Sequence, residues 1–185
     1  NNKTITVKEN IVNSGLGLTG YTVSDAKIDN TSYYVSNGGK YVITPSKTDY
    51  KKDIKIEWKP NNYTIKYSGN DTTVNIYGDS ITTKYTGSTA STNHTYDKFV
   101  TVATNGFEKE GYVFKEWNTK SDGTGTSYGN GADIGIANLV TTPNGSITLY
   151  AIWEAKSYYI YFDSNGGSLV KDYDELEFDK TLNCY

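Results

Sequence analysis

The stretch Gly111-Tyr112-Val113-Phe114-Lys115-Glu116-Trp117-Asn118-Thr119 decides the fold, because it sets two large aromatic side chains in a short run of strand-forming residues. A glycine-rich connection over residues 121–128 follows it, and residues 147–153 form an alternating strand that ends in another tryptophan. Two aromatic strands joined in this way predict a small β core. We expect four side chains to fill it: Phe114, Trp117, Leu149 and Trp153.

The composition favours a mainly β protein with many turns. The 185 residues include 18 Tyr and 18 Gly but only 3 Pro, and 36% of the chain is hydrophobic. Such a length allows roughly one to three domains. Helical periodicity is weak throughout, so that if a helix exists we expect it at Ala90–Phe99 or Asp133–Leu139.

Charge and targeting signals exclude several classes of protein. The net charge is −3 and every basic residue is lysine, which argues against nucleic acid, whose phosphates and bases are bound mainly by arginine. No apolar run reaches the roughly 18 residues of a membrane span, so we expect no membrane insertion. The chain begins with Asn and contains no Met, as expected of a processed protein or a fragment.

Residues 1–60 predict an N-terminal β module that resembles a small sandwich. Its short strands are spaced evenly and separated by turn residues, and residues 54–58 alternate cleanly, with Trp58 on the apolar face. Lys59-Pro60-Asn61-Asn62 then predicts a tight linker, because Pro60 cannot continue a ladder of hydrogen bonds.

An internal repeat organises the rest of the chain. Trp58 is followed by an aromatic strand over residues 63–67, and Trp153 is followed by a similar strand and an Asn-Gly-Gly turn over residues 159–167. Tyr96-Asp97-Lys98 likewise matches Phe178-Asp179-Lys180, and residues 72–92 carry an extra hairpin in the first copy. These matches predict a central module over 61–155 and an incomplete start of a further repeat over 156–185. We expect the latter to be ordered only by leaning on the preceding repeat or by pairing with another molecule.

Residues 63–153 resemble the Listeria–Bacteroides repeat, the B-repeat of internalin B and of many bacterial surface proteins. The resemblance rests on the ordered set Tyr63–Tyr67, Tyr96–Lys98, Asn105–Phe107, Gly111–Thr119, Asp122–Tyr128 and Leu149–Trp153. Ser68-Gly69-Asn70-Asp71 and the extra hairpin depart from the family pattern, and residues 1–60 do not match the repeat. The resemblance implies a β-grasp-like unit, a small twisted sheet with one short helical or irregular segment.

The residues offer little catalytic chemistry. His94 is the only histidine and has no nucleophile near it in sequence, so we expect a surface or packing residue. Cys184, the only cysteine, is a candidate either for pairing between molecules or for a small core position. The acidic cluster lacks the spacing of a calcium loop and predicts a solvated face: Asp172, Asp174, Glu175, Glu177 and Asp179. We therefore expect no enzyme activity, no cofactor and no metal.

A concentration of lysines marks one candidate binding surface for an acidic glycan. It comprises Lys47, Lys51, Lys52, Lys55 and Lys59. Lysines at a strand edge also prevent sheets from pairing edge to edge, and we favour that interpretation.

Two function classes remain open. One is a non-catalytic spacer or adhesin module of a Gram-positive cell-surface protein, and the other is an accessory spacer or glycan-binding module of a secreted multidomain enzyme. Both predict an extracellular location, either on the cell surface or secreted. The near absence of cysteine fits either the cytosol or a Gram-positive surface. The expected partners are neighbouring repeats of the same chain, with host or cell-wall polysaccharide or protein as further candidates.

Overall fold

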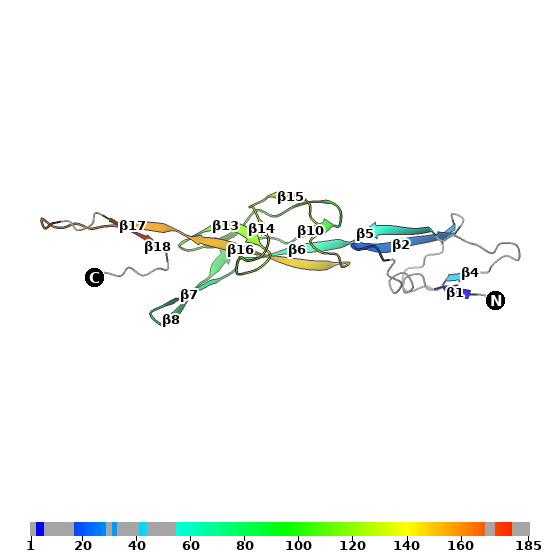
Figure 1. The fold of residues 1–185 in the computed structure, drawn as a ribbon, viewed down its shortest axis with the longest axis horizontal. Coiled ribbons are helices and arrows are strands. Elements are labelled where there is room, and N and C mark those ends of the chain that lie inside the picture. Colours follow the sequence, from blue (N-terminus) through cyan, green and yellow to red (C-terminus); the bar gives the residue numbers. More distant parts are fainter. Residues whose placement is uncertain are drawn as a thin grey trace. The chain divides into compact units, whose positions relative to one another are not determined.

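The computed structural model describes residues 3–5, 17–28, 31–32, 41–43, 55–168 and 173–178. The chain forms two compact units. One comprises Asn1–Thr64, Asn93–Phe99 and Ile136–Ser146, and the other comprises Ile65–Thr92, Val100–Gly135 and Ile147–Tyr185. All regular structure in the described residues is β, which confirms the mainly β prediction (Figure 1).

Neither of the two segments that the sequence offered for a helix forms one. Residues 92–95 form one strand, a turn follows, and residue 99 begins the next strand; residues 133–136 form a further strand. The described residues contain no helix. The sequence reason is that both segments lack the apolar spacing that would give a helix a buried face. The resemblance allowed an irregular segment in place of a helix, and this second alternative is the one observed.

The strands, in chain order, are β1 (Lys3–Ile5), β2 (Tyr21–Ile28), β3 (Thr31–Ser32), β4 (Tyr41–Ile43), β5 (Lys55–Pro60), β6 (Asn62–Ser68), β7 (Thr72–Ile76), β8 (Asp79–Thr83), β9 (Tyr85–Gly87), β10 (Thr92–Thr95), β11 (Phe99–Thr101), β12 (Phe107–Lys109), β13 (Tyr112–Asn118), β14 (Ser127–Tyr128), β15 (Asp133–Ile136), β16 (Gly145–Ala155), β17 (Ser157–Tyr161) and β18 (Tyr173–Glu177). They form a five-stranded sheet in the order β10-β6-β16-β13-β14, a three-stranded sheet in the order β3-β2-β5, and five two-stranded ribbons.

The core of the second unit surrounds Trp117. This residue is completely buried, its ring lies 4.8 Å from that of Tyr67 and 5.0 Å from that of Phe114, and its Nε1–H donates to the carbonyl of Ala103. Leu149 is also fully buried, whereas Phe114 and Trp153 are only half-buried. The predicted core is therefore right for Trp117 and Leu149, while Phe114 and Trp153 sit partly at the surface.

The extra hairpin predicted between residues 72 and 92 is β7–β8. Its strands pair from Thr72↔Thr83 to Ile76↔Asp79, and the two turn residues, Tyr77 and Gly78, both have positive φ. Two positive φ angles define the tight turn that matches the twist of paired strands. The hairpin extends away from β13 and β16 (Figure 1), and Tyr77 is 81% exposed.

Two antiparallel pairs, one on each side of β6 in sequence, share the same register. In β13–β16, Tyr112 pairs with Ala155 and Phe114 with Trp153, and a bulge follows Phe114. In β2–β5, Tyr21 pairs with Pro60 and Val23 with Trp58, and a bulge follows Val23. In both pairs a tyrosine begins the first strand, an apolar residue pairs with a tryptophan, and a bulge follows that apolar residue.

The last described strands repeat the opening of the central module. Asn70 and Asn165 occupy corresponding positions after the opening strand, and both have positive φ, at 55° and 44°. In the same register Ile65 is fully buried, but Ile160 is 37% exposed, and β17 pairs only with β18 among the described residues. Residues 157–161 therefore adopt the strand expected of a repeat opening while its apolar face is uncovered.

Candidate functional site

Asn61 alone separates β5 from β6, and both of its backbone groups are bonded. Its N–H donates to the carbonyl of Gly20 at 2.8 Å, and its carbonyl accepts from the N–H of Tyr96 at 2.8 Å. The Tyr96 ring packs edge-on against Tyr21, with centroids 5.6 Å apart. Gly20 has φ +82°, and a Cβ there would lie 2.3 Å from the Tyr96 ring, so only glycine fits. We call these four residues, Gly20, Tyr21, Asn61 and Tyr96, the first junction.

The same arrangement occurs where β16 leads into β17. The N–H of Lys156 donates to the carbonyl of Gly111 at 2.9 Å, and its carbonyl accepts from the N–H of Phe178 at 2.9 Å. The Phe178 ring packs edge-on against Tyr112 at 5.5 Å, and a Cβ on Gly111, with φ +73°, would lie 2.2 Å from that ring. We call Gly111, Tyr112, Lys156 and Phe178 the second junction.

The two junctions match residue for residue. Each has a glycine in the left-handed region, a tyrosine after it, a single linking residue and an aromatic ring that closes over the glycine. Because both backbone groups of each linking residue are hydrogen-bonded, neither residue is free to turn as an open linker would. The junctions are therefore ordered connections, each built inside one compact unit.

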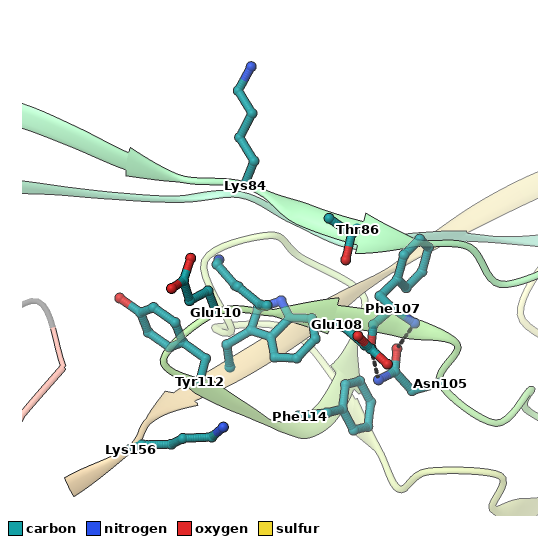
Figure 2. Close-up of a pocket in the computed structure, with 11 residues that line it drawn as sticks. Lys84, Thr86, Asn105, Phe107, Glu108, Glu110, Tyr112, Phe114 and Lys156 are labelled. Carbon is teal, nitrogen blue, oxygen red and sulfur yellow. Dashed lines mark hydrogen bonds between the residues drawn. The ribbon is translucent and has the colours of Figure 1, made fainter. Parts of the chain in front are cut away.

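A cavity of about 540 Å³ lies beside the second junction. We call it the Trp153 pocket; its lining includes Tyr112, Phe114, Trp153 and Lys156. Figure 2 shows Tyr112 and Phe114 along the strand that borders the hollow, with the Lys156 side chain extending into it and the Lys84 side chain pointing away. The Asn105 amide closes a local turn by bonding both backbone groups of Phe107, at 2.9 and 3.0 Å. The pocket thus has an aromatic wall with charged groups at its rim, a lining typical of sites that hold a ligand or a peptide segment.

Lys109, which also lines the Trp153 pocket, is a buried cation that the sequence did not single out. It is only 5% exposed, and its Nζ donates to the carbonyl of Asn70 at 3.0 Å and to the hydroxyl of Thr72. The ammonium also lies over the rings of Tyr112 and Trp153, 5.0 and 5.7 Å from their centroids. Because Lys109 already occupies those π faces, the pocket is poorly suited to a cationic ligand.

A second cavity, of about 400 Å³, borders the first junction. We call it the Trp58 pocket. Its lining includes Tyr21, Val23, Trp58 and Asn61, which occupy the same register positions as Tyr112, Phe114, Trp153 and Lys156. Residues 141–143, the turn before β16, complete its lining, and the Asn61 side-chain amide donates to the carbonyl of Thr141 at 2.8 Å.

The predicted lysine surface is only partly described. Lys55 and Lys59 lie exposed on one face of β5, whereas Lys47, Lys51 and Lys52 lie outside the described residues. Glu57 lies between the two exposed lysines and forms an ion pair with Lys27, whose Nζ is 2.7 Å from Glu57 Oε1. The same Nζ lies 3.7 Å from Asp25 Oδ2. The hydrogen bond to Glu57 raises the pKa of Lys27. Acidic groups on this face reduce its attraction for an anionic glycan, whose binding here stays a prediction.

The other chemically notable residues do not form a catalytic group in the described part of the chain. His94 stacks on the ring of Tyr63, with centroids 5.6 Å apart, and burial lowers its pKa. Asp174, Glu175 and Glu177 lie on β18, and among the described residues no three His, Cys, Asp or Glu side chains gather as metal ligands do. Cys184, Asp172 and Asp179 fall outside the described residues.

The sequence carries a signal for the junctions. The dipeptide Gly-Tyr occurs at residues 20–21 and at 111–112, and in both cases the linking residue stands three positions after a tryptophan. The closing ring comes from residues 96 and 178, which the internal repeat had already aligned. What the sequence lacked was the register that brings these separate segments together.

Comparison with known proteins finds a family match in the central part of the chain. Residues 63–152 match the Listeria-Bacteroides repeat domain. This match confirms the resemblance seen in the sequence, and the repeat begins two residues after the linking residue Asn61. A Gly-rich membrane protein of Evansella cellulosilytica is 32% identical over 122 residues, which is 65% of this chain. The chain spans only 12% of that relative's length. No solved structure matches the chain significantly.

The relative's description concerns a membrane, whereas the described residues here contain no helix long and apolar enough to cross one.

Proposed function

We propose that this chain is a non-catalytic spacer segment of a bacterial cell-surface protein, in which repeat modules follow one another through ordered junctions. The observation that carries the proposal is the recurrence of one junction geometry at Asn61 and at Lys156. A linker with unbonded backbone groups would let modules swing freely, whereas a linker with both groups bonded transmits orientation from one strand to the next. Stiff connection is the property that a stalk needs to hold a distal domain away from a surface.

The match to a repeat family and the relative called a Gly-rich membrane protein support a location at the bacterial surface. The proposal includes no reaction, because the chemistry-bearing side chains of the described residues serve packing: His94 stacks on Tyr63, and Lys109 is enclosed by Asn70, Thr72 and two rings. An adhesin role is compatible with the same architecture and would add a binding surface to the spacer.

The alternative is an accessory spacer or glycan-binding module of a secreted multidomain enzyme. The aromatic wall of the Trp153 pocket favours it, since aromatic rings stack on the apolar faces of sugars. The compensated charge around Glu57 weakens the version of this alternative that relies on lysines and acidic polysaccharide.

Distances measured across the first junction test the spacer role. Spin labels would be placed at the exposed residues Ser24 and Thr126 in a Cys184→Ser chain, with Lys115 and Thr126 as a matched pair that does not cross the junction. A stiff junction predicts a single distance distribution as narrow for Ser24–Thr126 as for the control pair. A distribution several times broader, with the control pair still narrow, would show a flexible connection and defeat the spacer proposal.

A further inference from the structure

The two pockets beside the junctions have equivalent walls, but they differ in the segment that completes the lining. Both walls include a tyrosine, an apolar residue (Val23 or Phe114) and a tryptophan from an antiparallel strand pair, together with the linking residue. In the Trp58 pocket, residues 141–143 of the repeat that follows Asn61 complete the lining. The Trp153 pocket has no corresponding segment among the described residues that line it, and it is the larger cavity, at about 540 Å³ against about 400 Å³.

The contacts of residues 141–143 show how such a segment binds. The Thr141 carbonyl accepts from the Asn61 side-chain amide at 2.8 Å, and two positions after Thr142 the N–H of Asn144 donates to the carbonyl of Asn62 at 2.8 Å. The linking residue and its neighbour therefore recognise the turn mainly through its backbone. Backbone recognition tolerates sequence change in the turn, which is what successive, diverged repeats require.

Lys156 can replace Asn61 in this contact. Its side chain extends into the Trp153 pocket (Figure 2), and an ammonium donates to a carbonyl as an amide does. Ser157 follows it at the position of Asn62 and supplies a backbone carbonyl as Asn62 does. The pocket wall beside these two residues includes the half-buried aromatic rings of Phe114 and Trp153. Such rings can pack against a turn of the Thr-Thr-Pro type.

We infer that the Trp153 pocket is a docking site for a second copy of the same repeat, and that it takes the turn that precedes the closing strand of that copy, the counterpart of residues 141–143. The inference rests on the proposed role as a spacer built from successive repeats, and it adds the surface by which one repeat holds the next. The ligand is thus a polar, proline-containing peptide turn and not a cation. Lys109 is consistent with this assignment, because its ammonium group, which belongs to the module itself, already lies over the rings of Tyr112 and Trp153.

A tandem chain tests the inference. Residues 1–156 are kept, and a second copy of residues 62–155 is joined directly after Lys156. Reactivity of lysine amines toward an acetylating reagent is then compared between the tandem chain and the original chain, with the exposed Lys115 of the first copy as the reference. Docking predicts that acetylation of Lys156 falls severalfold relative to Lys115 in the tandem chain. Replacement of Thr142 by Arg in the second copy, at an exposed position outside the core, is expected to restore it.

Two further measurements separate the inference from the proposed function. The indole N–H resonance of the second copy's Trp117 reports whether that copy is folded, and amide exchange at Lys156 reports whether the junction has formed. Unchanged Lys156 acetylation with a folded second copy and a protected Lys156 amide would overturn the docking site and leave the spacer role standing. Unchanged acetylation with a rapidly exchanging Lys156 amide and a folded second copy would overturn both.

Discussion

The side-chain oxygen of Asn118 accepts a hydrogen bond from the backbone N–H of Gly125 at 3.0 Å, seven residues further along the chain. The same oxygen accepts from the N–H of Lys120, and the amide of Asn118 donates to the carbonyl of Gly123 and to the hydroxyl of Ser127. Asn118 is completely buried, so its side chain supplies the hydrogen bonds that water would otherwise give to the polar groups of this irregular loop. One amide thus fixes the glycine-rich connection between β13 and β14.

Replacing Asn118 with Ala is expected to destabilise the protein by about 2–4 kcal/mol, because several buried backbone groups lose their partners. Asn118→Asp should be nearly as damaging, since a carboxylate cannot donate to the carbonyl of Gly123. Chemical denaturation followed by tryptophan fluorescence measures both. Asn93→Ala, at an exposed asparagine with one side-chain bond to Thr64, is the control and should change stability by no more than about 0.5 kcal/mol. Equal effects at Asn118 and Asn93 would contradict this role.

Replacing Trp117 with Ala should cost about 3–5 kcal/mol, from lost burial and the cavity left behind. Trp153→Ala should cost less, because Trp153 is only half-buried, although it also loses its bond to the carbonyl of Gly69. Phe99→Ala serves as the control, since 73% of that residue is exposed. A larger loss at Trp153 than at Trp117 would place the centre of the core elsewhere.

Gly111→Ala should loosen the second junction. The new methyl group would collide with the ring of Phe178, and the positive φ adds a backbone cost of about 1–2 kcal/mol. Gly78→Ala is a matched control, because Gly78 also has positive φ but a methyl group added there, in the hairpin turn, would meet no other atom within 4 Å. We expect the amide resonances of Lys156 and Phe178 to shift and to exchange faster in Gly111→Ala alone. The same shifts in Gly78→Ala would mean that backbone strain, and not the ring contact, is responsible.

Acid should weaken the first junction. The Tyr21 hydroxyl donates to Asp97, and this bond, followed by the one from the Asn138 amide, lowers the pKa of Asp97 below its ordinary value of about 3.9. A carboxyl whose pKa is lower in the folded state contributes stability that is complete above about pH 3.9 and is lost as the pH falls through the folded pKa. Tyr21→Phe removes the largest cause of the shift, so the carboxyl pKa of Asp97, measured by NMR titration, should rise toward about 3.9. An unchanged titration in Tyr21→Phe would show that the hydroxyl does not hold the carboxylate.

Much of the fold follows from local sequence, and the parts that do not follow from it depend on long-range register. The aromatic strands around Trp117, the extra hairpin and the copy of the repeat opening at residues 157–161 are encoded by alternation and turn residues, which act over a few positions. The matching register of β2–β5 and β13–β16 is not visible in this way, because beyond the Gly-Tyr dipeptide and a tryptophan the two ribbons share little sequence.

The tight linker at residues 59–62 was predicted, but the hydrogen bonds of the junctions and their recurrence at Lys156 were not, for the same physical reason. Asn61 and Lys156 differ in side chain, and their shared role lies in backbone hydrogen bonds to segments that are tens of residues away. The buried position of Lys109 was equally hidden, since its partners Asn70 and Thr72 belong to the turn and the extra hairpin, both of which depart from the family pattern. The lysine surface, by contrast, was predicted from a count of charges, which does not include Asp25 and Lys27, the side chains that pairing with β2 brings beside Glu57.

Amide hydrogen exchange at the linking residues tests the central claim most directly. The N–H groups of Asn61 and Lys156 donate to Gly20 and Gly111, and those of Tyr96 and Phe178 donate back to the linking residues. We predict that all four amides of the intact, monomeric chain exchange slowly, at rates close to those of neighbouring strand amides and far below those of an unstructured peptide. Exchange at Asn61 and Lys156 as fast as in an unstructured peptide, while the amide of Trp117 stays protected, would contradict ordered junctions.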